Sequence, residues 1–303
     1  MRYSYILANS GLLAMVAGHG LVTSIQGANG VTMPGLSVAD GTPRDCSSNG
    51  CGSQADTSII RDKELGTSKA SALGRTQGNG PVDASVMIAN FMDGAGAPTN
   101  EGAASSAGVE DDLSALNKQN KRGVLGDLLG GLTGGSSSSS SKGTKSEQPE
   151  ETSVKASAGQ GASSGLPTCS DDGTITMTFR QINQDGAGPL KADVDGTSGG
   201  TDADAFQTAE VTQDVPGLPI GGLSLATNTD FPVTVQMPAG MTCEASVGGA
   251  DNVCIVRVRN GAAAGPFGGS AAFTQSPAAR KRAIAYRLKK RAEAEKYKNR
   301  RLR

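Results

Sequence analysis

The sequence is poor in aromatic residues and in histidine. Among its 303 residues there is no tryptophan, only 3% are aromatic, and His19 is the single histidine. Because the chain also holds 43 glycines and 13 prolines, we expect one modest core with long irregular segments, not two large domains. The lack of a second histidine excludes a zinc site of mixed ligands, and it leaves His19 as the sole candidate base for a serine-histidine-aspartate set.

Long apolar runs are also missing, apart from one near the start of the chain. Residues 6–17 form an apolar run that follows a basic start and is too short to span a bilayer. This pattern predicts a signal peptide over residues 1–18. A cut between Gly18 and His19 places Val16 and Gly18 at the two positions where the peptidase selects small residues. We therefore expect a secreted, extracellular protein without a transmembrane segment.

Such a cut would make His19 the first residue of the mature chain. An amino-terminal histidine offers a metal two nitrogens, its free amine and its ring, and this pair suits copper(II) in tetragonal geometry. The sequence therefore predicts a copper site at His19. Two alternatives remain open: the peptidase cuts elsewhere, or His19 simply begins the first strand.

The five cysteines are an odd set. Secreted proteins use disulfides, and short spacing favours bridges of Cys46 with Cys51 and of Cys243 with Cys254. Cys169 then remains as a free thiol or as a link to another chain. Spacing alone does not fix the connectivity, but no interval matches that of a zinc site, so structural bridges are expected.

Charge is distributed unevenly along the chain. The net charge is −1 at pH 7, yet residues 280–303 hold twelve Lys or Arg against Glu293 and Glu295. The rest of the chain is consequently acidic. A basic tail of this kind contacts anionic surfaces, extends into solvent, or is removed at one of its dibasic pairs. A solvated or removable tail is favoured, because nothing nearby in the sequence balances its charge.

Short β-prone runs make up the first part of the chain. Residues 21–25 predict a first strand, and a proline restricts residues 31–38 to a loop or an edge strand. Residues 56–60 predict a short helix capped by Asp56 or by the serine two positions later. The apolar spacing of residues 82–92 predicts the main helix of this part.

A low-complexity tract of Ser, Gly and Lys covers residues 131–165 and includes six consecutive serines. This composition buries too little apolar surface to order itself, so a disordered insert is expected. Just before it, Lys121 and Arg122 form a dibasic pair. The pair is either a site for a processing protease of the secretory pathway or a solvated charge pair in a loop.

The second half of the chain carries the clearest strand pattern. Residues 174–179, 231–237 and 254–259 alternate between polar and apolar, which predicts a mainly β fold, an immunoglobulin-like β-sandwich with long loops and short helices. A glycine-free segment follows and predicts a helical basic tail over residues 276–303. The expected organisation is a single sandwich domain over residues 19–275, interrupted by the insert and followed by the tail.

Five short segments are recognisable when they are taken in order. They are residues 19–22 (HGLV), 40–46 (DGTPRDC), 56–62 (DTSIIRD), 183–189 (NQDGAGP) and 265–269 (GPFGG). Together they resemble the fungal appressorium-specific virulence protein family, and they cover both parts of the chain outside the linker and the tail. The resemblance implies a secreted protein of plant- and insect-infecting fungi that acts in penetration of the host surface, and it brings no settled catalytic activity.

The second half also resembles, more distantly, the lytic polysaccharide monooxygenases and related copper proteins, which share a β-sandwich and an amino-terminal histidine. Those oxygenases complete their copper site with a second imidazole, which this chain lacks. The resemblance therefore implies a carboxylate as the third ligand, and Asp45, Asp56 and Asp83 are the candidates.

These observations favour a virulence factor that binds and does not catalyse. We expect it to bind cell-wall polysaccharide or a host surface protein during appressorium-mediated penetration, and not to bind nucleic acid. The first alternative is a copper-dependent enzyme that cleaves polysaccharide oxidatively through His19. The second is an effector released by proteolysis at Lys121 and Arg122 or within the tail. Apart from copper, no cofactor is indicated.

Overall fold

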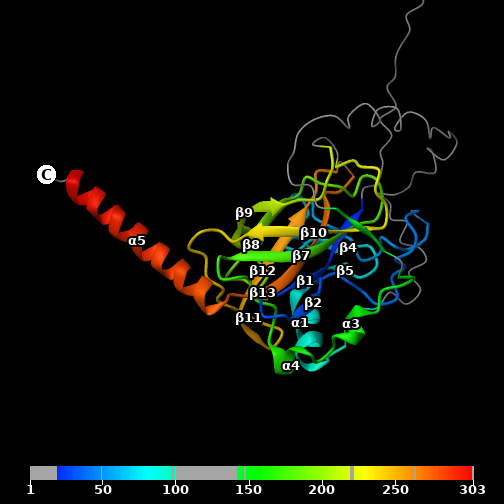
Figure 1. Ribbon diagram of the computed structural model, residues 1–303, viewed down its shortest axis with the longest axis horizontal. Helices are drawn as coiled ribbons and strands as arrows, with labels where there is room; N and C mark the ends of the chain where they lie inside the picture. The colour runs from blue at the N-terminus through cyan, green and yellow to red at the C-terminus, as the bar shows by residue number, and fades with distance from the viewer. Residues whose placement is uncertain are drawn as a thin grey trace, which may run out of the picture.

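The fold is built on one curled antiparallel sheet. The computed structural model describes residues 19–48, 50–96, 99, 142–146, 148–218, 222–262 and 264–301. In these residues short helices lie at one end of the sheet, and a long helix at the carboxyl end points away from it (Figure 1). The predicted fold class, mainly β and sandwich-like, is confirmed.

The elements follow one another as short runs. The strands are β1 (Gly20–Gln26), β2 (Thr32–Pro34), β3 (Ser58–Ile59), β4 (Arg75–Thr76), β5 (Gly80–Pro81), β6 (Thr144–Lys145), β7 (Thr174–Gln181), β8 (Lys191–Asp195), β9 (Phe206–Gln213), β10 (Thr229–Gln236), β11 (Ala245–Val247), β12 (Ala250–Arg259) and β13 (Phe267–Thr274). The helices are α1 (Ala84–Asp93), α3 (Ser153–Ala156), α4 (Gly161–Ser164) and α5 (Pro277–Arg301), with a 3₁₀ turn, η2, at Ala203–Ala205.

Pairing within one sheet accounts for the alternation of polar and apolar residues in the predicted strands. The order is β2-β1-β7-β10-β9-β8-β12-β13-β3-β4-β5, with β6 beside β10 and β11 beside β12. In β7, Ile175, Met177 and Phe179 are buried, while the residues between them are half-buried. Side chains of a strand alternate between the two faces of its sheet, so this pattern gives β7 one face toward the core. β2 ends at Pro34 on the sheet edge, where a residue without a backbone N–H is tolerated.

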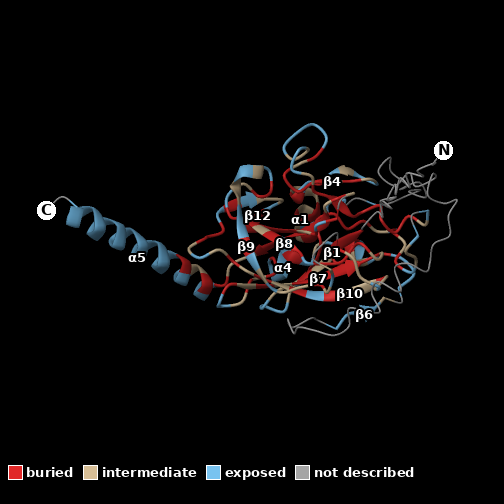
Figure 2. Cartoon of the chain, turned by 90° about the horizontal axis from the view of Figure 1, so that it is seen from above, coloured by how far each residue is buried: buried red, intermediate tan, exposed pale blue. Residues whose placement is uncertain are grey.

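The sheet curls until its two halves face each other. The amide of Leu36, just after β2, donates to the carbonyl of Ser270 in β13 over 2.8 Å. A Cβ on Gly269 would lie only 2.6 Å from the amide nitrogen of Val22, so glycine is what allows β13 to approach β1 this closely. The two halves enclose one main apolar core, seen as the red interior in Figure 2.

The helix predicted over residues 82–92 is confirmed as α1. The Asp83 carboxylate caps it by accepting from the amide of Ser85 over 2.8 Å, and Gly94 ends it in the left-handed region at φ 78°. Met87, Ile88 and Phe91 are buried, so the apolar face of α1 packs on the sheet.

The predicted helical tail is confirmed as α5. Figures 1 and 2 show it leaving the body as a single straight helix. Only Ala279 and Ala283, near its start, are buried. Its strong helix formers, Ala, Lys, Arg and Glu, explain why it holds its shape with so little packing. Within the described residues, no helix has the length and apolar character that a membrane crossing requires.

Both predicted disulfides are present. Cys46 is bonded to Cys51 and Cys243 to Cys254, while Cys169 is a buried free thiol whose pKa is raised by that burial. The second bridge ties Cys243, two residues before β11, to β12, as expected for a link between neighbouring strands.

Removing the Cys243–Cys254 bridge by a double replacement with alanine should lower the free energy of unfolding by about 3 kcal/mol, because the bridge closes an eleven-residue separation in the unfolded chain. The Cys46→Ala/Cys51→Ala variant is the matched control. It releases a separation of five residues, so it should lose about 2 kcal/mol or less. Urea unfolding measures both values, and a larger loss in the control would contradict the prediction.

The helix predicted over residues 56–60 is wrong. Ser58 and Ile59 form strand β3, in which Ile59 pairs with Phe267 of β13. The capping pattern is real, but the edge of β13 recruits this segment, and such tertiary pairing overrides local propensity.

The disordered insert predicted over residues 131–165 extends too far. Residues 148–165 contain α3 and α4, and Glu151 and Val154 are buried. A few buried side chains anchor this Ser- and Gly-rich stretch, which composition alone does not reveal. The dibasic pair Lys121 and Arg122 lies outside the described residues, as does the predicted signal peptide.

Candidate functional site

His19 is buried at the start of β1, with 1% of its surface exposed. Its backbone amide donates to Oδ1 of Asn183 over 2.7 Å, and its carbonyl accepts from the amide of Ile182 over 3.0 Å. Its ring lies against the ring of Phe267, with centroids 4.3 Å apart. The backbone and ring of His19 are both engaged in packing.

Three of the five recognised segments meet at this point. Residues 19–22 contribute His19, residues 183–189 contribute Asn183, and residues 265–269 contribute Phe267. A Cβ on Gly186 would lie 1.9 Å from the carbonyl oxygen of His19, which only glycine avoids. These motif residues therefore join the amino-terminal strand to two loops that are distant in sequence.

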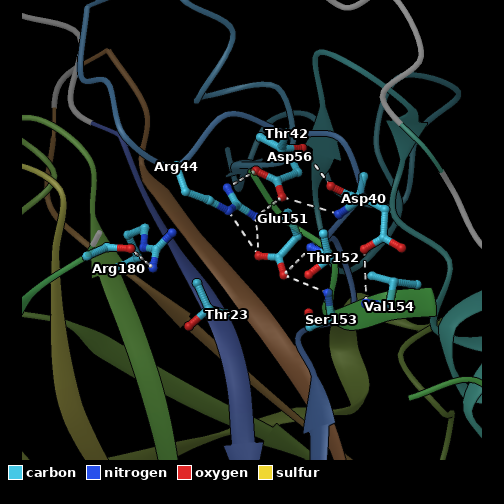
Figure 3. Close-up of polar contacts among 12 residues, drawn as sticks. Thr23, Asp40, Thr42, Arg44, Asp56, Glu151, Thr152, Ser153, Val154 and Arg180 are labelled. Atoms are coloured by element: carbon cyan, nitrogen blue, oxygen red, sulfur yellow. Dashed lines mark hydrogen bonds and ion pairs between the residues drawn. The ribbon is translucent and has the colours of Figure 1, made fainter. Parts of the chain in front are cut away.

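A second cluster lies around Arg44, whose side chain is fully buried (Figure 3). Its guanidinium donates to both carboxylate oxygens of Asp56, over 3.0 and 2.5 Å, and to Oε2 of Glu151 over 3.0 Å. Asp56 also accepts from the amide of Ala39 over 3.2 Å. One cation thus holds two buried carboxylates that lie 12 and 107 residues away in sequence.

The charges in this cluster stabilise one another. Burial alone would raise the pKa of Glu151, but the Arg44 charge and the hydrogen bonds from Ser153 and Arg44 outweigh it, so the pKa lies below its usual value. Burial alone would lower the pKa of Arg44, but the charges and hydrogen bonds of Asp56 and Glu151 outweigh it, so this pKa lies above its usual value. Arg44 and Glu151 therefore both stay ionised at neutral pH.

Asp40 and Glu151 hold the segment that follows the described gap. The Asp40 carboxylate accepts from the amides of Val154 and Lys155 over 3.0 and 2.8 Å, at the start of α3. Glu151 accepts from the amides of Thr152 and Ser153 with its second oxygen. Figure 3 shows these groups converging from separate segments. The cluster has the character of a structural clamp, since it is closed to solvent.

The three carboxylates predicted as copper ligands lie in different settings. Asp56 is bound by Arg44, Asp83 caps α1, and Asp45 is exposed. In the part of the chain that the structure describes, no group of three or more His, Cys, Asp or Glu side chains is placed to hold a metal. Two of the three candidates are thus engaged elsewhere, Asp56 in an ion pair and Asp83 in a helix cap. Chelation by the amine and ring of His19 alone stays a prediction.

An open cleft of about 250 Å³ lies where α5 meets the sheet. Its lining comes from the turn before β7, the end of β10 with the loop that follows, and the first turns of α5. The members are Asp171, Asp172, Gly173, Gln236, Met237, Pro238, Ala239, Gly240, Met241, Gln275, Ala279, Arg282, Ala283 and Tyr286.

The cleft combines an aromatic ring with fixed polar groups. The Tyr286 side chain is 42% exposed and packs against Gly240, where a Cβ would come within 2.9 Å of the ring. Arg282 donates to the carbonyl of Asp171 over 2.9 Å, and Gln236 donates to the carbonyl of Asp172 over 2.8 Å. The cleft thus presents an apolar ring face beside oriented hydrogen-bonding groups.

Asp172 gives the cleft a carboxylate that remains ionised in acid. Hydrogen bonds from the Ser170 hydroxyl and from Thr174 lower its pKa to about 2. An ionised carboxylate accepts hydrogen bonds from hydroxyl groups, so this side of the cleft is suited to a ligand rich in hydroxyls.

Sequence reasoning did not find Arg44, Glu151 or Tyr286 as site residues. Arg44 lies in a recognised segment, but nothing in the sequence links it to Glu151. Tyr286 lies in the basic tail, whose charge pattern favours a solvated segment. The only available signal was its ring, which is rare in a chain with 3% aromatic residues.

Comparisons with known proteins agree with the sequence resemblance. The profile of a family described as "Egh16-like virulence factor" matches residues 17–268. The chain is 59% identical over 292 residues to "Appressoria-specific virulence factor GAS2" of Pyricularia oryzae, covering 96% of this chain and 95% of that protein. It is 38% identical over 131 residues to "Appressoria-specific virulence factor GAS1" of the same fungus, covering 42% and 51% of the two chains. No solved structure matches.

Proposed function

Because this chain belongs to the Egh16-like virulence factor family, which supports a role in virulence at the appressorium, we propose that it is a secreted protein that acts there by binding cell-wall polysaccharide. The observation that carries this proposal is the cleft beside Tyr286. It is open to solvent, whereas the His19 and Arg44 clusters are buried.

The chemistry of the cleft suits a sugar ring. A pyranose has an apolar C–H face, which stacks on an aromatic ring, and hydroxyls at its edge, which bond to carboxylates and amides. The cleft offers Tyr286 for the first contact and Asp172 and Gln236 for the second. A host surface protein is the other partner expected from the sequence, but a small cleft that combines apolar and polar lining favours the sugar.

Catalysis is not part of this proposal. The aromatic and polar residues around the cleft are a tyrosine, two glutamines, two aspartates and an arginine. Asp172 has a strongly lowered pKa, so it is not poised as a general acid, and Asp171 accepts from the Ser276 hydroxyl over 2.8 Å. The oxidative copper enzyme has less support, because Asp56 is bound by Arg44 and Asp83 caps α1, so neither is free to act as its third ligand.

Replacing Tyr286 with alanine should weaken binding to an insoluble neutral glycan, chitin or β-glucan, by about tenfold, which corresponds to the loss of one stacked ring. Tyr297→Ala is the matched control, since Tyr297 is 66% exposed on the same helix and does not line the cleft. Depletion assays with the secreted full-length protein measure both. Equal binding by wild type and Tyr286→Ala, or no binding at all, would contradict the proposal.

A further inference from the structure

The outer part of α5 is a projecting, strongly basic surface. Between Pro277 and Arg301 there are eleven Lys or Arg and two Glu. Every residue from 284 to 301 is exposed, and Figure 2 shows this part of the helix standing clear of the body. Four of the five exposed large hydrophobic residues of the described chain also lie here: Ile284, Tyr286, Leu288 and Tyr297.

The basic residues surround the helix. Successive residues of an α-helix point about 100° apart, so Lys289, Lys290 and Arg291 already face three directions. A helix that lies in a bilayer surface needs one continuous apolar face, and α5 has none. A flexible polyanion can contact such a helix from any side, so the charge distribution favours a polymer over a membrane.

Two tyrosines add a repeated unit to this surface. Tyr286 and Tyr297 are eleven residues apart, which places them on the same face about 16 Å apart along the axis. Each has a cation near its ring: Nζ of Lys290 lies 5.8 Å from the ring centroid of Tyr286, and Cζ of Arg301 lies 5.9 Å from that of Tyr297. An aromatic ring beside a cation suits a sugar ring that bears a carboxylate.

We propose that the outer part of α5 binds a carboxylated polysaccharide, a polymer of uronic acid sugars. The inference rests on the proposed function in taking a polysaccharide as partner, but apart from Tyr286 it uses residues outside the cleft. The chain outside the tail is acidic, as the net charge of −1 requires. That body would repel nucleic acid, with its dense charge, more than it would repel a polymer with one charge per sugar.

The test uses the full-length protein and polygalacturonate as probe. The wild type should bind it, with an affinity that falls about tenfold between 50 and 200 mM salt, because exposed charges are screened. Lys296→Glu/Lys298→Glu/Arg300→Glu should weaken binding at least tenfold. The control Lys63→Glu/Lys69→Glu/Lys191→Glu makes the same net charge change at exposed positions on the body, and it should change affinity less than twofold.

The remaining arms separate the outcomes. Fully methyl-esterified polygalacturonate should bind at least tenfold more weakly, and Tyr297→Ala should weaken binding of the charged form. Equal loss in both charge variants, or tighter binding to single-stranded DNA or to phosphatidylserine vesicles, would overturn this inference. If neutral glycans bind through Tyr286 while polygalacturonate does not, only this inference fails. If polygalacturonate alone binds, only the cleft fails.

Discussion

Replacing Arg44 with leucine should lower the free energy of unfolding by about 3–5 kcal/mol, because it leaves two buried carboxylates without their cation. The Arg44 and Asp56 side chains are 0% exposed and that of Glu151 is 7% exposed, so water cannot take the place of the guanidinium. Urea unfolding followed by circular dichroism gives the value. Arg287→Leu is the control, since Arg287 and Glu244 are about half exposed and 3.9 Å apart, and it should cost less than about 1 kcal/mol.

A double variant tests whether the loss comes from charge. Adding Glu151→Gln to Arg44→Leu should recover part of the loss, because it removes one of the stranded charges. A double variant that is no more stable than Arg44→Leu alone would show that the cost comes from packing.

The pH dependence of stability should also show the contribution of the Glu151 charge. The folded pKa of Glu151 lies below the ordinary value of 4.5. Its contribution is therefore fully present above that value, and it is lost as pH falls through the lowered folded pKa. Stability of the wild type should decline below pH 4.5, and Glu151→Gln should flatten part of that decline.

Phe267→Ala should cost about 3–5 kcal/mol, the range for removing a buried aromatic ring. The ring is 0% exposed, lies on the ring of His19 and belongs to the residue that pairs with Ile59. Its loss should loosen both the amino-terminal strand and the β3 edge. Tyr297→Ala removes a ring of similar size from an exposed position and should stay within about 0.5 kcal/mol of wild type.

Hydrogen exchange gives a second reading of this prediction. The amide of Ile182 donates to the carbonyl of His19, and in Phe267→Ala it should exchange faster than amides in β7 do. Unchanged exchange at Ile182, or a stability loss below about 1 kcal/mol, would mean that the ring contact does not hold the strand.

Elements that bury one regular face were predictable from the sequence. The alternation in β7 and the apolar spacing in α1 reflect packing on a single core, and both appear where the pattern places them. β3 was not predictable, since its two residues become a strand only beside β13. The order of residues 148–165 was equally hidden, because it depends on Glu151 meeting a cation 107 residues away.

The site residues were likewise predictable only where their contacts are local in sequence. Local spacing was enough for the disulfides, whose cysteines lie 5 and 11 residues apart. The surroundings of His19 depend on contacts with Asn183, 164 residues away, and with Phe267, which no local pattern records. The cleft was missed because its aromatic residue sits on a helix whose charge pattern resembles that of a solvated tail.

The interleaving of the sheet bears on what a cut in the chain would do. β1 and β3 come from before residues 97–141, and they pair with β7 and β13, which come from after them. Each disulfide lies on one side of that boundary. A protease acting at Lys121 and Arg122 would thus create a two-chain protein that stays together without a covalent link. It would elute as one particle in gel filtration and separate into two fragments only in denaturant, so no small fragment would diffuse away.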